Sequence, residues 1–211
     1  MPSRLTDIYT TLFAHFGPQH WWPGDTPIEI TVGAILTQNT AWTNVERAIA
    51  NLRDAGLLDF ASLLALPTGE LAQYIRPAGY YNLKAKRLHN LLAMVAARHA
   101  DLDGFLSQDT ESLRQALLAV NGIGPETADS IALYAAGKPL FVVDAYTHRI
   151  LHRHGLAEEE ADYHSLQERF MTELPPDPQL YNEYHALIVR LGKEYCRKSS
   201  PRCTGCPLEH L

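Results

Sequence analysis

The sequence predicts an all-α protein, on three observations. Apolar residues recur every three or four positions over most of the chain, which is the spacing of one buried helix face. The alternation of apolar and polar residues that is typical of strands is not sustained anywhere. Clusters of Gly and Pro fall between the periodic segments, so the elements and their connections are short. With 211 residues and 46% hydrophobic content, the chain can bury one substantial core or two small ones. We therefore expect about ten packed helices.

The helical spacing can be followed from the N-terminus, with turns where it is interrupted. It is carried in order by Leu5, Ile8, Leu12 and Phe16; Ile30, Ala34 and Leu36; Val45, Ile49 and Leu52; Leu88, Leu91, Leu92 and Val95; and Leu113, Leu117 and Val120. Glycine or proline predicts breaks at residues 54–56, 66–69, 76–79 and 121–124. The run Pro175–Pro178 predicts a stiff surface turn before a final helix that contains His185 to Glu194.

Charge and hydropathy restrict the possible partners. The formal net charge of −6 argues weakly against nucleic acid, because phosphate binding depends on Lys and Arg. The basic side chains are nevertheless concentrated near the C-terminus, and acidic side chains are concentrated elsewhere. For each of these clusters, a solvated surface face is as good an interpretation as a binding site. The basic cluster comprises Arg190, Lys193, Arg197, Lys198 and Arg202, and an acidic run comprises Glu158, Glu159, Glu160 and Asp162. No window is apolar enough to span a membrane, and residues 1–16 lack the pattern of a signal peptide, so we expect a cytoplasmic protein.

The most informative segment is an apolar helix, a Gly-x-Gly turn and a second helix, over residues 117–132. Gly122 and Gly124 flank Ile123, and glycine permits positive φ and close approach of another backbone. Pro125 suits the first turn of the second helix, since its missing N–H costs nothing there. The outward-pointing amides of such a turn form a seat for phosphate without side-chain charge. Taken alone, the segment reads more readily as a plain connection between two helices.

An aspartate lies twenty residues beyond this turn, in Val143-Asp144. By its local sequence Asp144 is the N-cap of the helix that follows. Together, however, the turn and the aspartate resemble the helix-hairpin-helix DNA glycosylases of the endonuclease III superfamily. The resemblance extends from about Phe16 to Cys206 and implies that Asp144 is catalytic. A carboxylate at a helix N-terminus stays ionised, as stabilising a developing sugar cation requires.

The same resemblance implies the architecture and the DNA contacts. It implies two lobes with a DNA groove between them, one formed by residues 1–27 and 136–211 with the cysteine loop, the other a six-helix lobe of residues 28–135. Gln38, at the end of a segment that begins at Ile30, matches the glutamine that family members push into the DNA stack. The residues implied to contact DNA are Gln38, Gly122, Ile123, Gly124 and Thr127. The stretch from Arg76 to Arg87 resembles a family segment that we interpret as mainly structural.

Departures from the endonuclease III pattern indicate the branch. Glu126 stands where the bifunctional enzymes have their lysine, and Tyr146 stands at the position of a histidine. A glutamate cannot form the Schiff base that strand cleavage requires. Both features resemble the small bacterial 3-methyladenine glycosylases, as does Trp21-Trp22-Pro23. That branch implies a base pocket formed by Trp21, Trp22, Trp42, Tyr146 and Lys193. By its residue type alone, Trp22 fits a core anchor nearly as well as a pocket residue, and Lys193 fits a surface residue better.

These features predict a monofunctional glycosylase for alkylated purines in double-stranded DNA. An N3-alkylated purine is already cationic and leaves readily, so flipping, stacking and stabilisation of the sugar cation suffice. Three alternatives stay open: a monofunctional enzyme for another damaged or mismatched base, an endonuclease III-like glycosylase/lyase, and a non-catalytic DNA-structure-binding or interaction protein in which Asp144 is only an N-cap. A monomer is expected from the resemblance alone.

The three cysteines lie within the last sixteen residues, at Cys196, Cys203 and Cys206. An odd, clustered set is not a disulfide framework. The spacing resembles the first three ligands of the family's [4Fe–4S] loop, whose fourth cysteine would be residue 212, one beyond Leu211. Either the natural chain continues and completes the cluster, or His210 or another group replaces that ligand, or no cluster is held; three cysteines and a histidine also suit zinc. We expect a structural iron–sulfur cluster.

Overall fold

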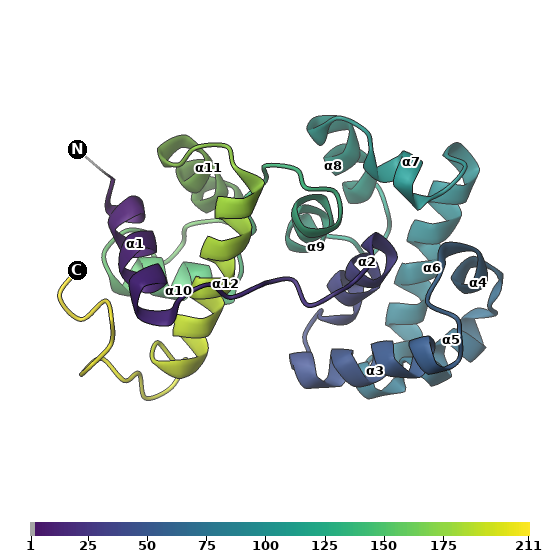
Figure 1. The fold of residues 1–211 in the computed structure, drawn as a ribbon, viewed down its shortest axis with the longest axis horizontal. Coiled ribbons are helices and arrows are strands. Elements are labelled where there is room, and N and C mark those ends of the chain that lie inside the picture. The colour runs from purple at the N-terminus through teal and green to yellow at the C-terminus, as the bar shows by residue number, and fades with distance from the viewer. Residues whose placement is uncertain (1–2) are drawn as a thin grey trace. The chain divides into compact units, whose positions relative to one another are not determined.

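A computed structural model shows the fold of residues 3–211 (Figure 1). It is all-α, as predicted, and the described residues form no strand. Residues 3–211 form twelve α-helices, more than the expected ten or so, because several have only one or two turns. Their bounds are α1 Arg4–Phe16, α2 Pro27–Leu36, α3 Trp42–Asp54, α4 Phe60–Ala65, α5 Thr68–Tyr74, α6 Tyr81–Arg98, α7 Leu102–Leu106, α8 Thr110–Leu118, α9 Pro125–Ser130, α10 Ala145–Arg153, α11 Tyr163–Glu173 and α12 Pro178–Glu194, with a 3-10 turn η1 at Arg76–Ala78 and a π turn η2 at Ile131–Ala135.

The chain divides into two compact units, one of residues 1–22 and 139–211 and one of residues 23–138. Sequence reasoning placed these boundaries after residues 27 and 135. The first lies earlier because Asp25 and Thr26 belong with α2: the Asp25 amide donates to Glu29, and the Thr26 hydroxyl accepts from the Glu29 amide. The second lies later because the Lys138 amide donates to the carbonyl of Ala132 and so closes the end of η2.

The first unit packs α1, α10, α11 and α12 around an aromatic core. The rings of Phe141 and Phe170 stack with centroids 3.8 Å apart, and the ring of Tyr184 meets both edge-on. The buried Tyr184 hydroxyl donates to the Leu5 carbonyl at 2.8 Å, which joins α12 to α1. The proline run does not end before the last helix as expected. Pro178 occupies the first turn of α12, where a proline needs no hydrogen-bond partner.

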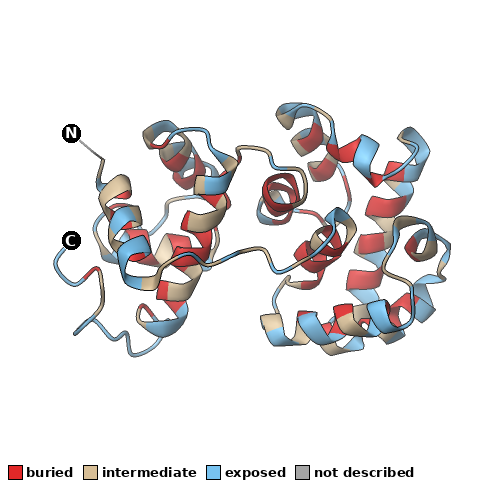
Figure 2. Ribbon diagram, in the orientation of Figure 1, coloured by how far each residue is buried: buried red, intermediate tan, exposed pale blue. Residues whose placement is uncertain are grey.

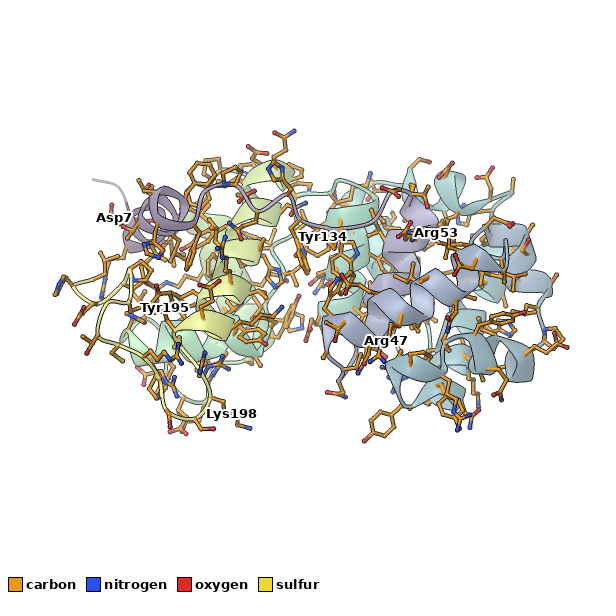
Figure 3. All side chains as sticks on the ribbon, turned by 60° about the horizontal axis from the view of Figure 1, so that its bottom comes forward. Asp7, Arg47, Arg53, Tyr134, Tyr195 and Lys198 are labelled. Atoms are coloured by element: carbon orange, nitrogen blue, oxygen red, sulfur yellow. The ribbon has the colours of Figure 1, made fainter. Side chains whose placement is uncertain are left out.

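The second unit contains α2 to α9 with η1 and η2, so the expected six-helix lobe has eight α-helices. The number six was implied by the family resemblance, and four of the eight helices, α4, α5, α7 and α9, have only five to seven residues. Helix α2 forms the centre of this unit, with every residue from Thr31 to Leu36 buried, and Figure 2 shows the buried faces of its neighbours turned inward. The buried Glu29 of α2 pairs with Arg53 of α3, which is labelled in Figure 3.

No helix in residues 3–211 is long and apolar enough to cross a membrane.

Candidate active site and DNA-binding hairpin

Asp144 begins α10 directly after a buried apolar run, Phe141 to Val143. The carboxylate oxygen Oδ1 accepts from both the amide of Thr147, at 2.7 Å, and its hydroxyl, at 2.9 Å. The Thr147 hydroxyl in turn lies 3.4 Å from the Asp144 amide, which completes a capping box. The predicted N-cap is therefore present, and it fixes one oxygen of the carboxylate while the side chain is only 12% exposed.

The second carboxylate oxygen of Asp144 faces a residue that sequence reasoning missed. Nε2 of His185, on α12, lies 3.6 Å from Oδ2. Burial raises the pKa of Asp144, but the polar contact with His185, the charge of that ring and the two bonds from Thr147 outweigh it. The pKa is held below its ordinary value, so Asp144 is a carboxylate at neutral pH. A lone histidine on a final helix gave no signal in the sequence that it would face the aspartate.

Tyr146 is the second residue of α10 and packs against the backbone of α12. A Cβ built on Gly192 would lie 2.2 Å from Cδ1 of Tyr146, so only glycine accommodates the ring at this position. The guanidinium of Arg149 lies 4.9 Å from the centre of the ring, within cation–π range. Lys193 follows Gly192 and is exposed. The predicted pocket residue Tyr146 is thus held against α12 at Gly192, the residue that precedes Lys193.

The tryptophans are divided between the two units. Trp21 and Trp22 belong to the first unit, and their rings meet edge to face with centroids 5.2 Å apart. Both are partly exposed. Trp42 belongs to the second unit, at the first position of α3, where its Nε1 donates to Glu46 at 2.9 Å.

The hairpin joins α8 to α9 as the sequence predicts, and Gly122 has a φ of +97°. A Cβ there would lie 2.4 Å from Cγ of Arg87, so Gly122 is required both for its backbone angle and for space. Gly124 is exposed with a φ of −95°, and within residues 3–211 no side chain caps the first turn of α9 that follows it. Ile123 is buried and anchors the turn.

Gln38 contacts this hairpin directly, although 84 residues separate it from Gly122. Its Nε2 donates to the carbonyl of Gly122 at 3.2 Å and to the hydroxyl of Thr127 at 3.0 Å. Arg87, on α6, donates to Oε1 of Gln38. The structure therefore brings three of the predicted DNA-contacting residues together. It adds Arg87, which the sequence placed only in a structural stretch. Glu126 is exposed on the first turn of α9.

The buried Lys84 ties the end of α2 to the end of the 3-10 turn η1 in the same unit. Its Nζ donates to the carbonyls of Leu36 and Ala78, both at 2.8 Å. Burial, and then the positive charge of Arg87, lower the pKa of Lys84 to about 8. Leu36 lies two residues before Gln38, and Ala78 lies two residues before Tyr80. Tyr80 is 72% exposed at the start of α6 with a left-handed φ of +46°.

Comparison with known proteins identifies the family. Residues 32–176, more than half of the chain, match the HhH-GPD superfamily of base excision DNA repair proteins. The chain belongs to this family. The provisionally named DNA repair glycosylase MJ1434 of Methanocaldococcus jannaschii is 47% identical over 211 residues, 99% of this chain and 96% of its own. The protein is thus a DNA repair glycosylase of base excision repair.

Two solved structures resemble this glycosylase closely. The 3-methyladenine DNA glycosylase (MagIII) of H. pylori, crystallised with 1,N6-ethenoadenine, is 30% identical with a TM-score of 0.78, over 89% of this chain and 96% of that one. Endonuclease III in a non-covalent complex with DNA gives a TM-score of 0.82 at 23% identity, over 100% of this chain and 95% of that one. The second likeness concerns the fold, which is the one expected from the sequence.

The cysteine loop of the glycosylase follows α12, where Tyr195 and Lys198 are labelled in Figure 3. Cys196, Cys203 and Cys206 line one cavity of about 350 Å³. Burial raises the pKa of the Cys206 thiol, and the charges of Cys196 and Cys203 raise it further. Among residues 3–211, no three His, Cys, Asp or Glu side chains are grouped closely enough to hold a single metal ion.

The loop is held to α10 by arginine. Arg153 donates to Sγ of Cys196 at 3.4 Å and to the carbonyls of Arg197, at 2.7 Å, and Lys198, at 3.1 Å. Arg149 donates to the Cys196 carbonyl at 2.8 Å. The helix that begins at Asp144 therefore also fixes the path of the loop that carries the cysteines.

Proposed function

We propose that this glycosylase is monofunctional and removes alkylated purines of the 3-methyladenine type from double-stranded DNA. The likeness to the H. pylori 3-methyladenine glycosylase carries the proposal, at 30% identity over 89% of the chain. Glu126, at the position of the family's lysine, supports the absence of lyase activity, because a carboxylate cannot form a Schiff base with the sugar. Trp21 and Trp22 supply aromatic faces for a flat cation.

The chemistry requires little beyond flipping the base and stabilising the sugar. An N3-alkylated adenine carries a positive charge, and it leaves as a neutral base with the electron pair of the bond to C1′. The sugar then carries the positive charge, which the ionised Asp144 stabilises electrostatically. Water adds to C1′ and loses a proton to complete hydrolysis. The lowered pKa of Asp144 supports this role, because a protonated carboxyl would offer no charge.

The second unit supplies the DNA contacts in this proposal. The amides of the hairpin after Gly124 receive a phosphate, which needs no side-chain charge and so is compatible with a net charge of −6. Gln38, held on the hairpin, enters the stack as the damaged nucleotide leaves it. Tyr80 adds an exposed ring that can stack on a base.

The test measures free base and strand breaks separately, from duplex DNA that carries 3-methyladenine, with the parent chain and Asp144→Asn. Asparagine caps helices as well as aspartate does, so the variant should fold while losing the charge. We expect base release without strand cleavage by the parent, and a fall of about 10²- to 10³-fold in the variant. Asp162→Asn is the matched control, since Asp162 caps α11 in the same way, accepting from the Ser165 amide at 2.8 Å.

The other outcomes point to the alternatives. Release of a neutral damaged or mismatched base in preference to 3-methyladenine would assign a different monofunctional specificity. Strand cleavage, with a protein–DNA adduct trapped by borohydride, would show that another lysine replaces Glu126. Full activity of Asp144→Asn would contradict the assignment of Asp144.

We further propose that Cys196, Cys203 and Cys206 hold a [4Fe–4S] cluster with a fourth ligand. Two observations support this proposal: the three cysteines line one cavity, and their spacing resembles that of a cluster loop. A bound cluster would act structurally, by holding the loop that presents Arg197, Lys198 and Arg202 to phosphates. Iron and acid-labile sulfide in the anaerobically purified protein, lost in Cys203→Ser, are expected. Zinc without sulfide would overturn the proposal.

A further inference from the structure

The two oxygens of the Asp144 carboxylate are held by different elements. Oδ1 receives both hydrogen bonds from Thr147, on the same helix. Oδ2 faces Nε2 of His185, from α12, at 3.6 Å. This distance is longer than an ordinary hydrogen bond, so the contact is electrostatic and can tighten when a substrate binds. The His185 side chain is only 8% exposed, so this contact is largely shielded from solvent.

The position of His185 is fixed on both sides. Its neighbour Tyr184 is fully buried, and the Tyr184 hydroxyl donates to the Leu5 carbonyl, which anchors this turn of α12 to α1. Gly192, two helical turns further along α12, lies against the ring of Tyr146. Residues seven positions apart share a helix face, so one face of α12 meets α10 at both Asp144 and Tyr146. This packing leaves His185 little freedom to move away from the carboxylate.

We propose that His185 is a positioning residue for Asp144, which holds Oδ2 while Thr147 holds Oδ1, so that the carboxylate cannot rotate and its charge stays directed at the sugar. The inference rests on the proposed role of Asp144. A carboxylate fixed through only one oxygen would turn about its Cβ–Cγ bond, and a displacement of about 1 Å can lower a rate by about 100-fold. Nothing in the reaction requires His185 to touch the substrate.

His185 also affects the charge of Asp144, which provides a specific readout. Among the groups that lower the pKa of Asp144, His185 contributes most, through its polar contact and its charge, and the bonds from Thr147 contribute less. Removing the imidazole leaves burial less opposed and raises the pKa of the carboxyl. Because Asp144 acts as a carboxylate, activity is lost as the pH falls through that pKa. The acid limb of the activity profile should therefore move to higher pH.

The experiment compares the parent with His185→Leu and His185→Gln in single-turnover base release as a function of pH. The substrate is whichever lesion the parent releases best. Glutamine can place an amide N–H near the position of Nε2, whereas leucine fills space without a donor. We expect the rate of His185→Leu to fall by about 10- to 100-fold with its acid limb moved to higher pH. His185→Gln should recover most of the rate. Binding of undamaged duplex DNA should stay unchanged in both.

Two further measurements make the result decisive. His148→Leu is the control, because His148 lies on α10 and contacts the carbonyl of Glu159 instead of Asp144, and parental behaviour is expected. Carbon-13 NMR titration of the Asp144 carboxyl measures its pKa without any substrate, and it should rise in His185→Leu.

A parental rate and acid limb in His185→Leu would overturn the inference, as would an unchanged Asp144 titration. If His185→Leu does not fold, the two polar variants decide. The inference would be overturned if His185→Gln had the rate and the Asp144 titration of the parent and His185→Asn had the pH profile of the parent. Full base release by Asp144→Asn would instead refute the proposed function, so the two failures are distinguishable.

Discussion

The contrast between Gly122 and Gly124 gives the sharpest prediction about the hairpin. Alanine at Gly122 requires an L residue at a φ of +97° and places its Cβ 2.4 Å from Cγ and 2.8 Å from Cδ of Arg87. Alanine at Gly124 meets nothing within 4 Å and keeps an ordinary φ of −95°. The same substitution, two residues apart, should therefore lower the free energy of unfolding far more at Gly122 than at Gly124.

The magnitudes follow from these contacts. The positive φ costs Gly122→Ala about 1–2 kcal/mol. Arg87 must also move, which breaks its bond to Oε1 of Gln38. A hydrogen bond to a charged group contributes about 1.5–3 kcal/mol when buried, and we take the lower end because Arg87 is partly exposed. Gly122→Ala should thus destabilise by about 2–4 kcal/mol. Gly124→Ala should change stability by less than about 1 kcal/mol, since alanine restricts the unfolded chain but is a poorer N-cap for α9 than glycine.

Urea unfolding of the two single variants, of Arg87→Ala and of the Gly122→Ala/Arg87→Ala double variant measures both quantities. Removing Arg87 leaves only the backbone cost at position 122, so the double-mutant cycle should show a coupling of about 1–2 kcal/mol. DNA affinity should fall in Gly122→Ala, because Gln38 loses its support, and in Gly124→Ala, because a methyl group obstructs the phosphate seat. Equal stability changes at the two glycines, or additive effects of Gly122→Ala and Arg87→Ala, would refute the reasoning.

Two further predictions concern packing and charge. Gly192→Ala should displace Tyr146 and lower the free energy of unfolding in urea by about 1–3 kcal/mol, although alanine is the better helix former. The added change Tyr146→Ser should recover much of this loss. An unchanged stability of Gly192→Ala would show that the ring moves freely. Lys84→Met leaves the carbonyls of Leu36 and Ala78 unsatisfied, which should cost about 1–3 kcal/mol. Because the folded pKa of about 8 lies below the ordinary 10.5, the unfolded chain binds more protons between these values, so the advantage of the parent over Lys84→Met should grow as the pH rises from 8 to 10.5. A pH-independent difference would show that Lys84 titrates normally.

Local patterns determined much of this protein. The apolar period of three to four residues gave the helical class, because a helix that packs on a core must repeat its buried face at that spacing. Gly122-Ile123-Gly124 predicted the turn, since positive φ there favours glycine. Asp144 was predicted as an N-cap, because an aspartate before an amphipathic helix satisfies the first amides, and the capping box with Thr147 confirms it.

The shortest helices could not be predicted from the sequence, and the reason is physical. Helices α4, α5 and α7 have five to seven residues and complete at most two turns, so their apolar positions cannot establish a period. They exist because capping and tertiary packing stabilise them, as where Asp59 and Asp101 accept from the amides of Ser62 and Gly104. The apolar pattern therefore does not predict these three helices.

The side chains around the proposed site were decided by tertiary structure. The sequence determined Asp144, the hairpin and the cysteines, because each belongs to a local motif with a fixed spacing. It did not determine that His185, 41 positions after Asp144, faces its second oxygen, nor that Arg87 and Gln38 meet on the hairpin. Contacts of this kind depend on how helices distant in the chain pack on one another. The sequence thus fixes the chemical groups, and only the folded chain sets their orientation and their charge.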